Sequence, residues 1–182
     1  FDGAELAKKG VVVVSVNYRL GIFGYFAHPD LSLESPHRVS GNYGLTDQIE
    51  ALKWIQKNIR MFGGDPEKVT VFGHSAGASS ILQLLTSPVA EGLMHSAIIQ
   101  SGYLPPIPAL REKKFNRSPA EQWTGLNNLA DSSITYLRSL SEVAVLNLAI
   151  NGNFEAFPNQ DGWLLPSQII DRFEQGTQEN IP

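Results

Sequence analysis

The feature that most constrains the fold is a five-residue segment that separates a short apolar run from an amphipathic stretch. Residues 69–72 read VTVF, which is typical of a buried strand, and residues 73–77 read GHSAG. Apolar residues then recur at helical spacing and stop before Pro88. A chain that passes from a strand directly into a helix must reverse sharply, and Gly73 and Gly77 are expected to avoid a Cβ clash there. The sequence therefore predicts a tight strand, turn and helix unit centred on Ser75.

Strands and helices are predicted to alternate around this turn. Residues 10–16 contain a near-continuous run of valines, the pattern of a strand buried on both faces of a parallel sheet. A single apolar stripe predicts a helix of about five turns, and its members are Leu45, Ile49, Leu52, Ile55, Ile59 and Phe62. Residues 97–100, which read AIIQ, are predicted to form the next strand. This order predicts an α/β fold with a central, mostly parallel sheet flanked by helices.

The character of the chain changes after residue 102. We expect residues 1–102 to form part of an α/β core and residues 103–182 to form a mainly helical excursion of the same domain. Residues 118–121, SPAE, have the pattern of a capping box with proline at the first helical position, and another helix is expected from about residue 166 to 175. Because the chain opens inside an expected helix and stops after a polar turn, we expect an internal fragment with an incomplete sheet.

Charge and cysteine content narrow the function classes. The net charge is -4 without a cluster of Lys or Arg, so nucleic acid is not a predicted partner. The chain has no cysteine and no His, Asp or Glu cluster at ligand spacing, so we predict no metal site and no cofactor. No apolar run approaches the roughly 20 residues that a membrane span needs. The small net charge without a basic cluster favours small neutral substrates. The composition is compatible with a secreted or a cytoplasmic location and with any oligomeric state.

Residues 73–77 match the G-x-S-x-G pattern of a nucleophile elbow. The predicted strand before them and the predicted helix after them are the context in which this pattern forms such an elbow. The turn forces Ser75 into a strained backbone conformation that holds its hydroxyl above the edge of the sheet. Because the next helix begins here, the N–H of Ala76 can hold an oxyanion. We predict Ser75 as the nucleophile of a serine hydrolase with the α/β-hydrolase fold, in preference to a purely structural turn. His74 adjoins it and is a candidate for a supporting role.

The acid and the base of a catalytic triad are not expected within this chain. In this fold they follow the serine in the order Asp or Glu, then His, each after a different strand. His95 is the only histidine after Ser75, Glu91 is the only carboxylate between them, and one βαβ unit alone takes roughly 30 residues. His95 also precedes residues 97–100, at the amino end of that strand. We therefore expect the triad to be completed beyond Pro182 and the second oxyanion donor to precede Phe1, so that the chain alone is inactive.

Several blocks together resemble the type-B carboxylesterase and lipase family, the cholinesterase-like serine esterases. The blocks lie within about residues 1–102 and read NYRLG (17–21), GNYGL (41–45), ALKWI (51–55), FGGDP (62–66) and VTVFGHSAGA (69–78). Beyond residue 102 the resemblance is loose and rests on residues 136–138 and 160–162.

The resemblance implies a two-step hydrolysis of a small-molecule carboxylic ester through an acyl-enzyme. Ser75 matches the family nucleophile and Ala76 its oxyanion amide, while Ser101 matches a segment near the triad and is implied in a supporting role. His74 stands where the family commonly has Glu, which leaves the substrate preference open. The competing hypothesis is a non-catalytic adhesion or binding protein on the same fold, and the intact serine between two glycines argues against it.

Overall fold

The computed structural model describes residues 2–103, 111–112 and 134–182. These residues belong to two compact units. Unit 1 comprises residues 1–18, 45–104 and 169–182, and unit 2 comprises residues 19–44 and 105–168. The sequence-based division at residue 102 stays a prediction.

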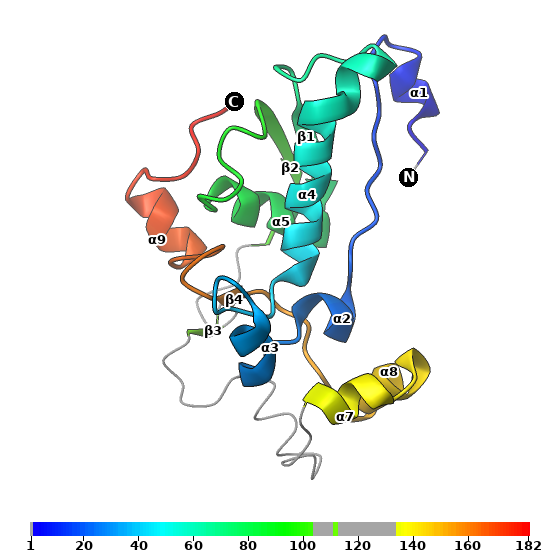
Figure 1. The fold of residues 1–182 in the computed structure, drawn as a ribbon. Helices are drawn as coiled ribbons and strands as arrows, with labels where there is room; N and C mark the ends of the chain where they lie inside the picture. The colour runs from blue at the N-terminus through cyan, green and yellow to red at the C-terminus, as the bar shows by residue number, and fades with distance from the viewer. Residues whose placement is uncertain (1, 104–110, 113–133) are drawn as a thin grey trace. The chain divides into compact units, whose positions relative to one another are not determined.

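Unit 1 contains a parallel pair of strands with a helix between them in sequence (Figure 1). Strand β1 (Thr70–His74) pairs with β2 (Ser96–Gln100), from Thr70 opposite Ser96 to His74 opposite Gln100. Helix α5 (Ala76–Leu85) packs on both strands. The predicted strands on either side of GHSAG and the predicted helix after it are therefore confirmed.

The long helix of unit 1 follows the predicted apolar stripe. Helix α4 (Tyr43–Asn58) continues into the 3₁₀ turn η1 (Ile59–Phe62) and ends at Gly63, whose φ of 79° is the left-handed conformation that glycine adopts readily. The stripe is buried from Leu45 to Ile59. Phe62 is 59% exposed, so the buried face ends one turn earlier than predicted. The remaining helices of the unit are α1 (Ala4–Ala7) and α9 (Ile169–Glu174), the latter lying inside the range expected for a helix near the end of the chain.

The prediction of a strand at residues 10–16 is wrong for the described structure. Residues 11–20 form neither helix nor strand, and Val11, Val12, Val14 and Val16 are exposed. A strand exists only where a neighbour accepts and donates its backbone hydrogen bonds, and the described β1 and β2 pair with each other. The valine pattern therefore specifies a segment that is suited to a sheet but has no paired neighbour in the described chain.

The described part of unit 2 combines helices with short strands. Its helices are α2 (Gly21–Tyr25), α3 (Pro29–Glu34), α7 (Ile134–Ser139) and α8 (Glu142–Asn151), and its short strands β3 (Arg111–Glu112) and β4 (Asn159–Gln160) are parallel. One buried hydrophobic cluster of the unit contains Ile22, Phe26, Ile134, Leu137 and Ala149. The helix start predicted at residues 118–121 lies outside the described residues, and the mainly helical excursion expected over residues 103–182 stays a prediction.

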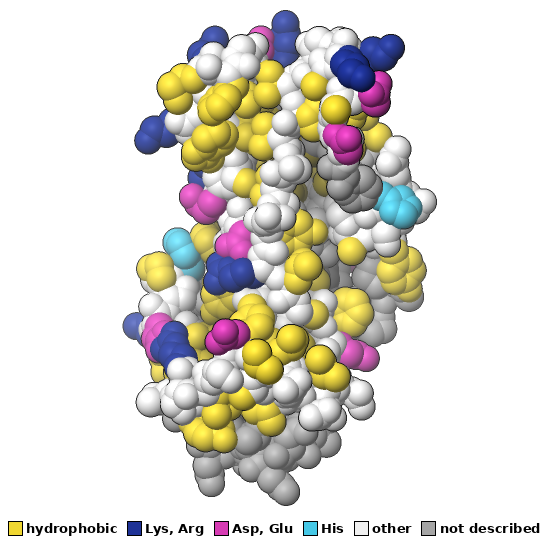
Figure 2. Space-filling view, turned by 90° about the vertical axis from the view of Figure 1, so that its right-hand side faces the viewer, with side chains coloured by type: hydrophobic (Ala, Val, Ile, Leu, Met, Phe, Trp, Pro, Cys, Tyr) yellow, Lys and Arg dark blue, Asp and Glu magenta, His cyan; other side chains and the backbone are white. Residues whose placement is uncertain are grey.

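Large apolar side chains remain exposed beside the strands. Phe72 on β1 and Ile98 on β2 are 52% and 50% exposed, and Figure 2 shows hydrophobic side chains over much of the viewed face. A parallel sheet is normally covered on both faces, so two paired strands that leave large apolar side chains exposed are an incomplete sheet. Among residues 2–103, 111–112 and 134–182, no helix is both long enough and apolar enough to span a membrane.

Candidate active site

Ser75 is the single residue between the last residue of β1 and the first residue of α5. Its φ of 55° and ψ of −119° lie outside the regions that residues with a side chain normally occupy. Such a conformation costs roughly 1–3 kcal/mol and persists only where the surrounding structure enforces it. The strained turn that the sequence predicted is therefore present.

The two glycines of the turn have different reasons to be there. A Cβ atom on Gly73 would lie 2.6 Å from the carbonyl carbon of Gly77 and 2.9 Å from the nitrogen of Ala78. Only glycine permits this approach of the strand to the helix. A Cβ atom on Gly77 would meet nothing within 4 Å in the described residues, so the expectation that both glycines avoid a clash is wrong for Gly77.

Backbone hydrogen bonds fix the turn while its side chains stay accessible. The N–H of Ser75 donates to the carbonyl oxygen of Gln100 at 3.0 Å, and the N–H of Ser79 donates to the carbonyl oxygen of Ser75 at 3.0 Å. His74, Ser75 and Ala76 are all exposed. As the first residue of α5, Ala76 has an N–H without an intrahelical acceptor, and the positive end of the helix dipole lies there. A hydroxyl and a backbone donor are thus presented together.

The carboxyl ends of β1 and β2 bring three predicted site residues to one edge. His74 ends β1 opposite Gln100, the last residue of β2, and Ser101 follows with a φ of 53°. His95 lies at the other end, since its N–H donates to the carbonyl oxygen of Val69 at 2.8 Å. This position agrees with the prediction that His95 is not the base for Ser75.

Comparison with known proteins decides the family. A model of the carboxylesterase family matches residues 1–181. The chain belongs to the carboxylesterase family. It is 46% identical to the fumonisin B1 esterase of Sphingopyxis macrogoltabida and 40% identical to carboxylesterase 5A of Homo sapiens, over its full length in both cases.

Solved structures agree with this carboxylesterase assignment and show the α/β-hydrolase fold in part. The fold matches a PNB esterase with a TM-score of 0.84 and 34% identity, over 100% of this chain and 39% of that one. The chain spans 34% of the fumonisin esterase and 31% of the human carboxylesterase. It therefore corresponds to about a third of a carboxylesterase.

Two other blocks that resemble carboxylesterases meet in a buried polar cluster of unit 2. One Oδ of Asp161 accepts hydrogen bonds from the N–H groups of Trp163, Leu164 and Leu165 at 2.8–3.0 Å. The other accepts from the Nδ2 of Asn42 at 2.9 Å. Asp161 is only 5% exposed, so its carboxyl group is buried, and both of its oxygens accept hydrogen bonds from the protein. This cluster joins residues far apart in sequence and is structural.

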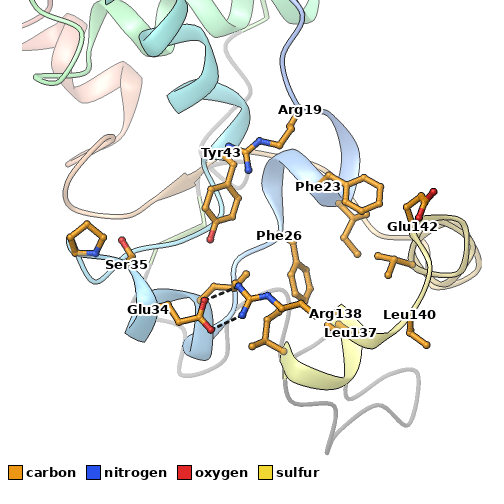
Figure 3. Close-up of a pocket in the computed structure, with 15 residues that line it drawn as sticks. Arg19, Phe23, Phe26, Glu34, Ser35, Tyr43, Leu137, Arg138, Leu140 and Glu142 are labelled. Carbon is orange, nitrogen blue, oxygen red and sulfur yellow. Dashed lines mark hydrogen bonds and ion pairs between the residues drawn. The ribbon is translucent and has the colours of Figure 1, made fainter.

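Unit 2 also contains an apolar pocket of about 680 Å³ (Figure 3). At its edge Arg138 donates two hydrogen bonds of 2.7 Å to Glu34, and these bonds lower the pKa of the Glu34 carboxyl. Burial raises the pKa of the Tyr43 phenol, over whose ring the Arg19 guanidinium lies at 5.1 Å. Nothing in this lining pairs a nucleophile with a base.

Within the described residues there is also no group of three or more His, Cys, Asp or Glu side chains that could hold a metal ion.

Sequence reasoning missed Ser79, one helical turn after Ser75. Its hydroxyl donates to the carbonyl oxygen of Tyr103 at 2.9 Å and accepts from the N–H of the same residue at 3.1 Å. The spacing of four residues from Ser75 places it near the turn, and that was the available signal. Its partner could not be read from the sequence because it lies beyond the next strand.

Proposed function

We propose that the protein to which this chain belongs hydrolyses small-molecule carboxylic esters through an acyl-enzyme on Ser75. The observation that carries the proposal is the strained, exposed serine between β1 and α5 in a chain of the carboxylesterase family. The names of two relatives, a fumonisin B1 esterase and a carboxylesterase, support an ester as the substrate class.

In the proposed reaction the Ser75 oxygen attacks the acyl carbon while a histidine takes its proton. The negative charge that develops on the carbonyl oxygen is held by the N–H of Ala76 at the start of α5. The alcohol then leaves with the proton, and water releases the acid from the serine by the same route. One oxyanion donor typically contributes about 10²- to 10³-fold to the rate.

The base and the acid are proposed to lie beyond Pro182, and the second oxyanion donor before Phe1. His95 is at the amino end of β2 and cannot serve Ser75, which lies at the carboxyl end of β1. The isolated chain is therefore proposed to be inactive. Without the triad, catalysis falls to about 10³- to 10⁴-fold over water even where the oxyanion hole is whole.

The roles of His74 and Ser101 are part of the proposal. Both lie at the edge that holds Ser75, since His74 ends β1 and Ser101 follows β2. Both are exposed, so each can contact a substrate or a residue of the rest of the protein. We assign them supporting contacts rather than a step of the reaction.

Turnover of p-nitrophenyl acetate by the full-length protein tests the proposal. Wild-type protein should hydrolyse the ester, and Ser75→Ala should reduce kcat by about 10⁶-fold, as loss of a triad serine does elsewhere. Ester turnover that survives Ser75→Ala would refute the proposal. A full-length protein that lacks an acid and a histidine after Pro182, and hydrolyses no ester, would favour the competing hypothesis of a non-catalytic binding protein.

A further inference from the structure

Ser79 makes a reciprocal contact that ordinary helix serines do not make. A serine inside a helix commonly bonds back to its own helix, as Ser80 does by donating to the carbonyl oxygen of Ala76 at 3.1 Å. Ser79 instead bonds to both backbone groups of Tyr103, which follows β2. Its side chain therefore ties one segment of unit 1 to another.

This contact closes a ring of hydrogen bonds around the strained turn. From Ser75 the ring runs through its N–H to the carbonyl oxygen of Gln100 at 3.0 Å, and then along the chain to Tyr103. From Tyr103 it crosses to the hydroxyl of Ser79, whose own N–H donates to the carbonyl oxygen of Ser75 at 3.0 Å. The ring therefore links the exits of both strands to the first turn of α5.

The ring contains two residues whose backbone conformation is strained and must be held by their surroundings. Ser75 and Ser101 are non-glycine residues with φ values of 55° and 53°. Residues with a side chain hold this conformation only where their surroundings determine it. Each of the two strained serines lies between hydrogen bonds of the ring, and the ring includes the Ser79 hydroxyl.

Packing confirms that the segment after β2 lies tightly on α5. A Cβ atom on Gly102 would lie 2.7 Å from the Cγ2 of Ile99 and 3.2 Å from the Cβ of Ala78. The backbone at Gly102 thus leaves no room for a side chain beside Ile99 of β2, and it lies in tight contact with Ala78 of α5. Tyr103 itself is 62% exposed, so its side chain packs little against the protein, whereas both of its backbone groups bond to the Ser79 hydroxyl.

We propose that Ser79 is a positioning residue whose hydroxyl fastens residues 101–103 to the first turn of α5. It thereby keeps Ser101 and the nucleophile Ser75 in the relative placement that acylation needs. The inference rests on the proposed function, because it assigns Ser79 a role in the same reaction. Placement of this kind matters, since a displacement of about 1 Å can cost about 10²-fold in rate.

The test compares three variants of the full-length protein. Ser79→Ala removes the hydroxyl from a helix position where alanine is well tolerated, Ser79→Thr keeps a hydroxyl, and Ser80→Ala is the matched control. The measurements are kcat and KM for p-nitrophenyl acetate, the rate of fluorophosphonate labelling of Ser75, and hydrogen exchange of residues 101–103.

Ser79→Ala should lower kcat and the labelling rate about tenfold with KM within about twofold, and should speed exchange of the Tyr103 N–H. Ser79→Thr should restore most of the labelling rate, and Ser80→Ala should stay within about twofold of wild type. Equal kcat and labelling in Ser79→Ala and Ser80→Ala, with an active wild type, would overturn the role of Ser79 alone. A wild type that neither labels nor hydrolyses esters would instead overturn the proposed function and the role that rests on it.

Discussion

The elbow at Ser75 and the cluster at Asp161 each place a polar side chain beside backbone N–H groups, yet the Ser75 side chain is exposed and the Asp161 side chain is buried. Asp161 is buried, and both of its oxygens accept hydrogen bonds from the protein. Ser75 is exposed and strained, and its helix start keeps a free N–H beside it. A site for chemistry thus keeps hydrogen-bonding capacity exposed, whereas both oxygens of the buried Asp161 are bonded within the protein.

The largest expected effect comes from replacing Ser75 by glycine, which should lower the activity and raise the stability. Ser75→Gly should reduce kcat by about 10⁶-fold because the nucleophile is gone. It should also stabilise the protein by about 1 kcal/mol, since glycine adopts a φ of 55° without strain. Ester kinetics together with the midpoint of thermal unfolding check both parts. A destabilised Ser75→Gly protein would show that the turn is not strained.

Asp161→Ala, unlike Ser75→Gly, should lower the stability of the protein. Three backbone N–H groups would lose a buried acceptor, which should destabilise the protein by about 3 kcal/mol. The control is Asp65→Ala, because Asp65 is exposed, accepts the N–H of Glu67 at 3.1 Å and lies 3.6 Å from the ammonium of Lys68, and exposed contacts of this kind contribute little. Denaturant unfolding of the two variants measures the difference. Equal stability of the two would contradict the structural role of Asp161.

The two glycines of the elbow should respond differently to replacement by alanine. Gly73→Ala places a methyl group 2.6 Å from the backbone of Gly77 and should cost about 2 kcal/mol together with most of the activity. A Cβ atom on Gly77 meets nothing within 4 Å among the described residues, so Gly77→Ala should leave the unfolding midpoint close to that of wild type. Thermal unfolding and ester turnover of the two variants decide the matter. If both lose stability equally, the account of the elbow is wrong.

The smallest effect is expected at the exposed ion pair of Glu34 and Arg138. Arg138 lowers the pKa of Glu34 in the folded state, so the contribution of the pair is present above the ordinary carboxyl range and is lost as the pH falls through the lowered pKa. Exposed pairs contribute little and are screened by salt. Thermal scans of Glu34→Gln should therefore differ slightly from wild type at neutral pH and low salt, and not at all in acid or in high salt. A large difference that persists in high salt would contradict this.

Local signals predicted the elbow well. The apolar run before Gly73, the helical spacing after Gly77 and the sharp reversal over Ser75 are properties of neighbouring residues, and the structure has all three. Helix α4 was predictable for the same reason, since its stripe repeats every three or four residues.

Other features could not be predicted because they depend on residues far apart in the chain. The valine run at residues 10–16 has the composition of a strand, but pairing requires a neighbour that sequence composition does not reveal. The contact of Ser79 with Tyr103 and that of Asn42 with Asp161 join segments that meet only in the folded chain. The free space at Gly77 likewise depends on what surrounds it, so the motif alone gave the wrong reason for that glycine.

The most direct test of the central claim, that the strained turn presents a reactive serine, is to locate the site of covalent labelling. The full-length protein is treated with a fluorophosphonate, digested and analysed by peptide mass spectrometry. If Ser75 is the reactive serine, we expect a single phosphonylated residue, Ser75, and no labelling of a Ser75→Ala variant. Labelling of another serine, or equal labelling of the variant, would contradict it.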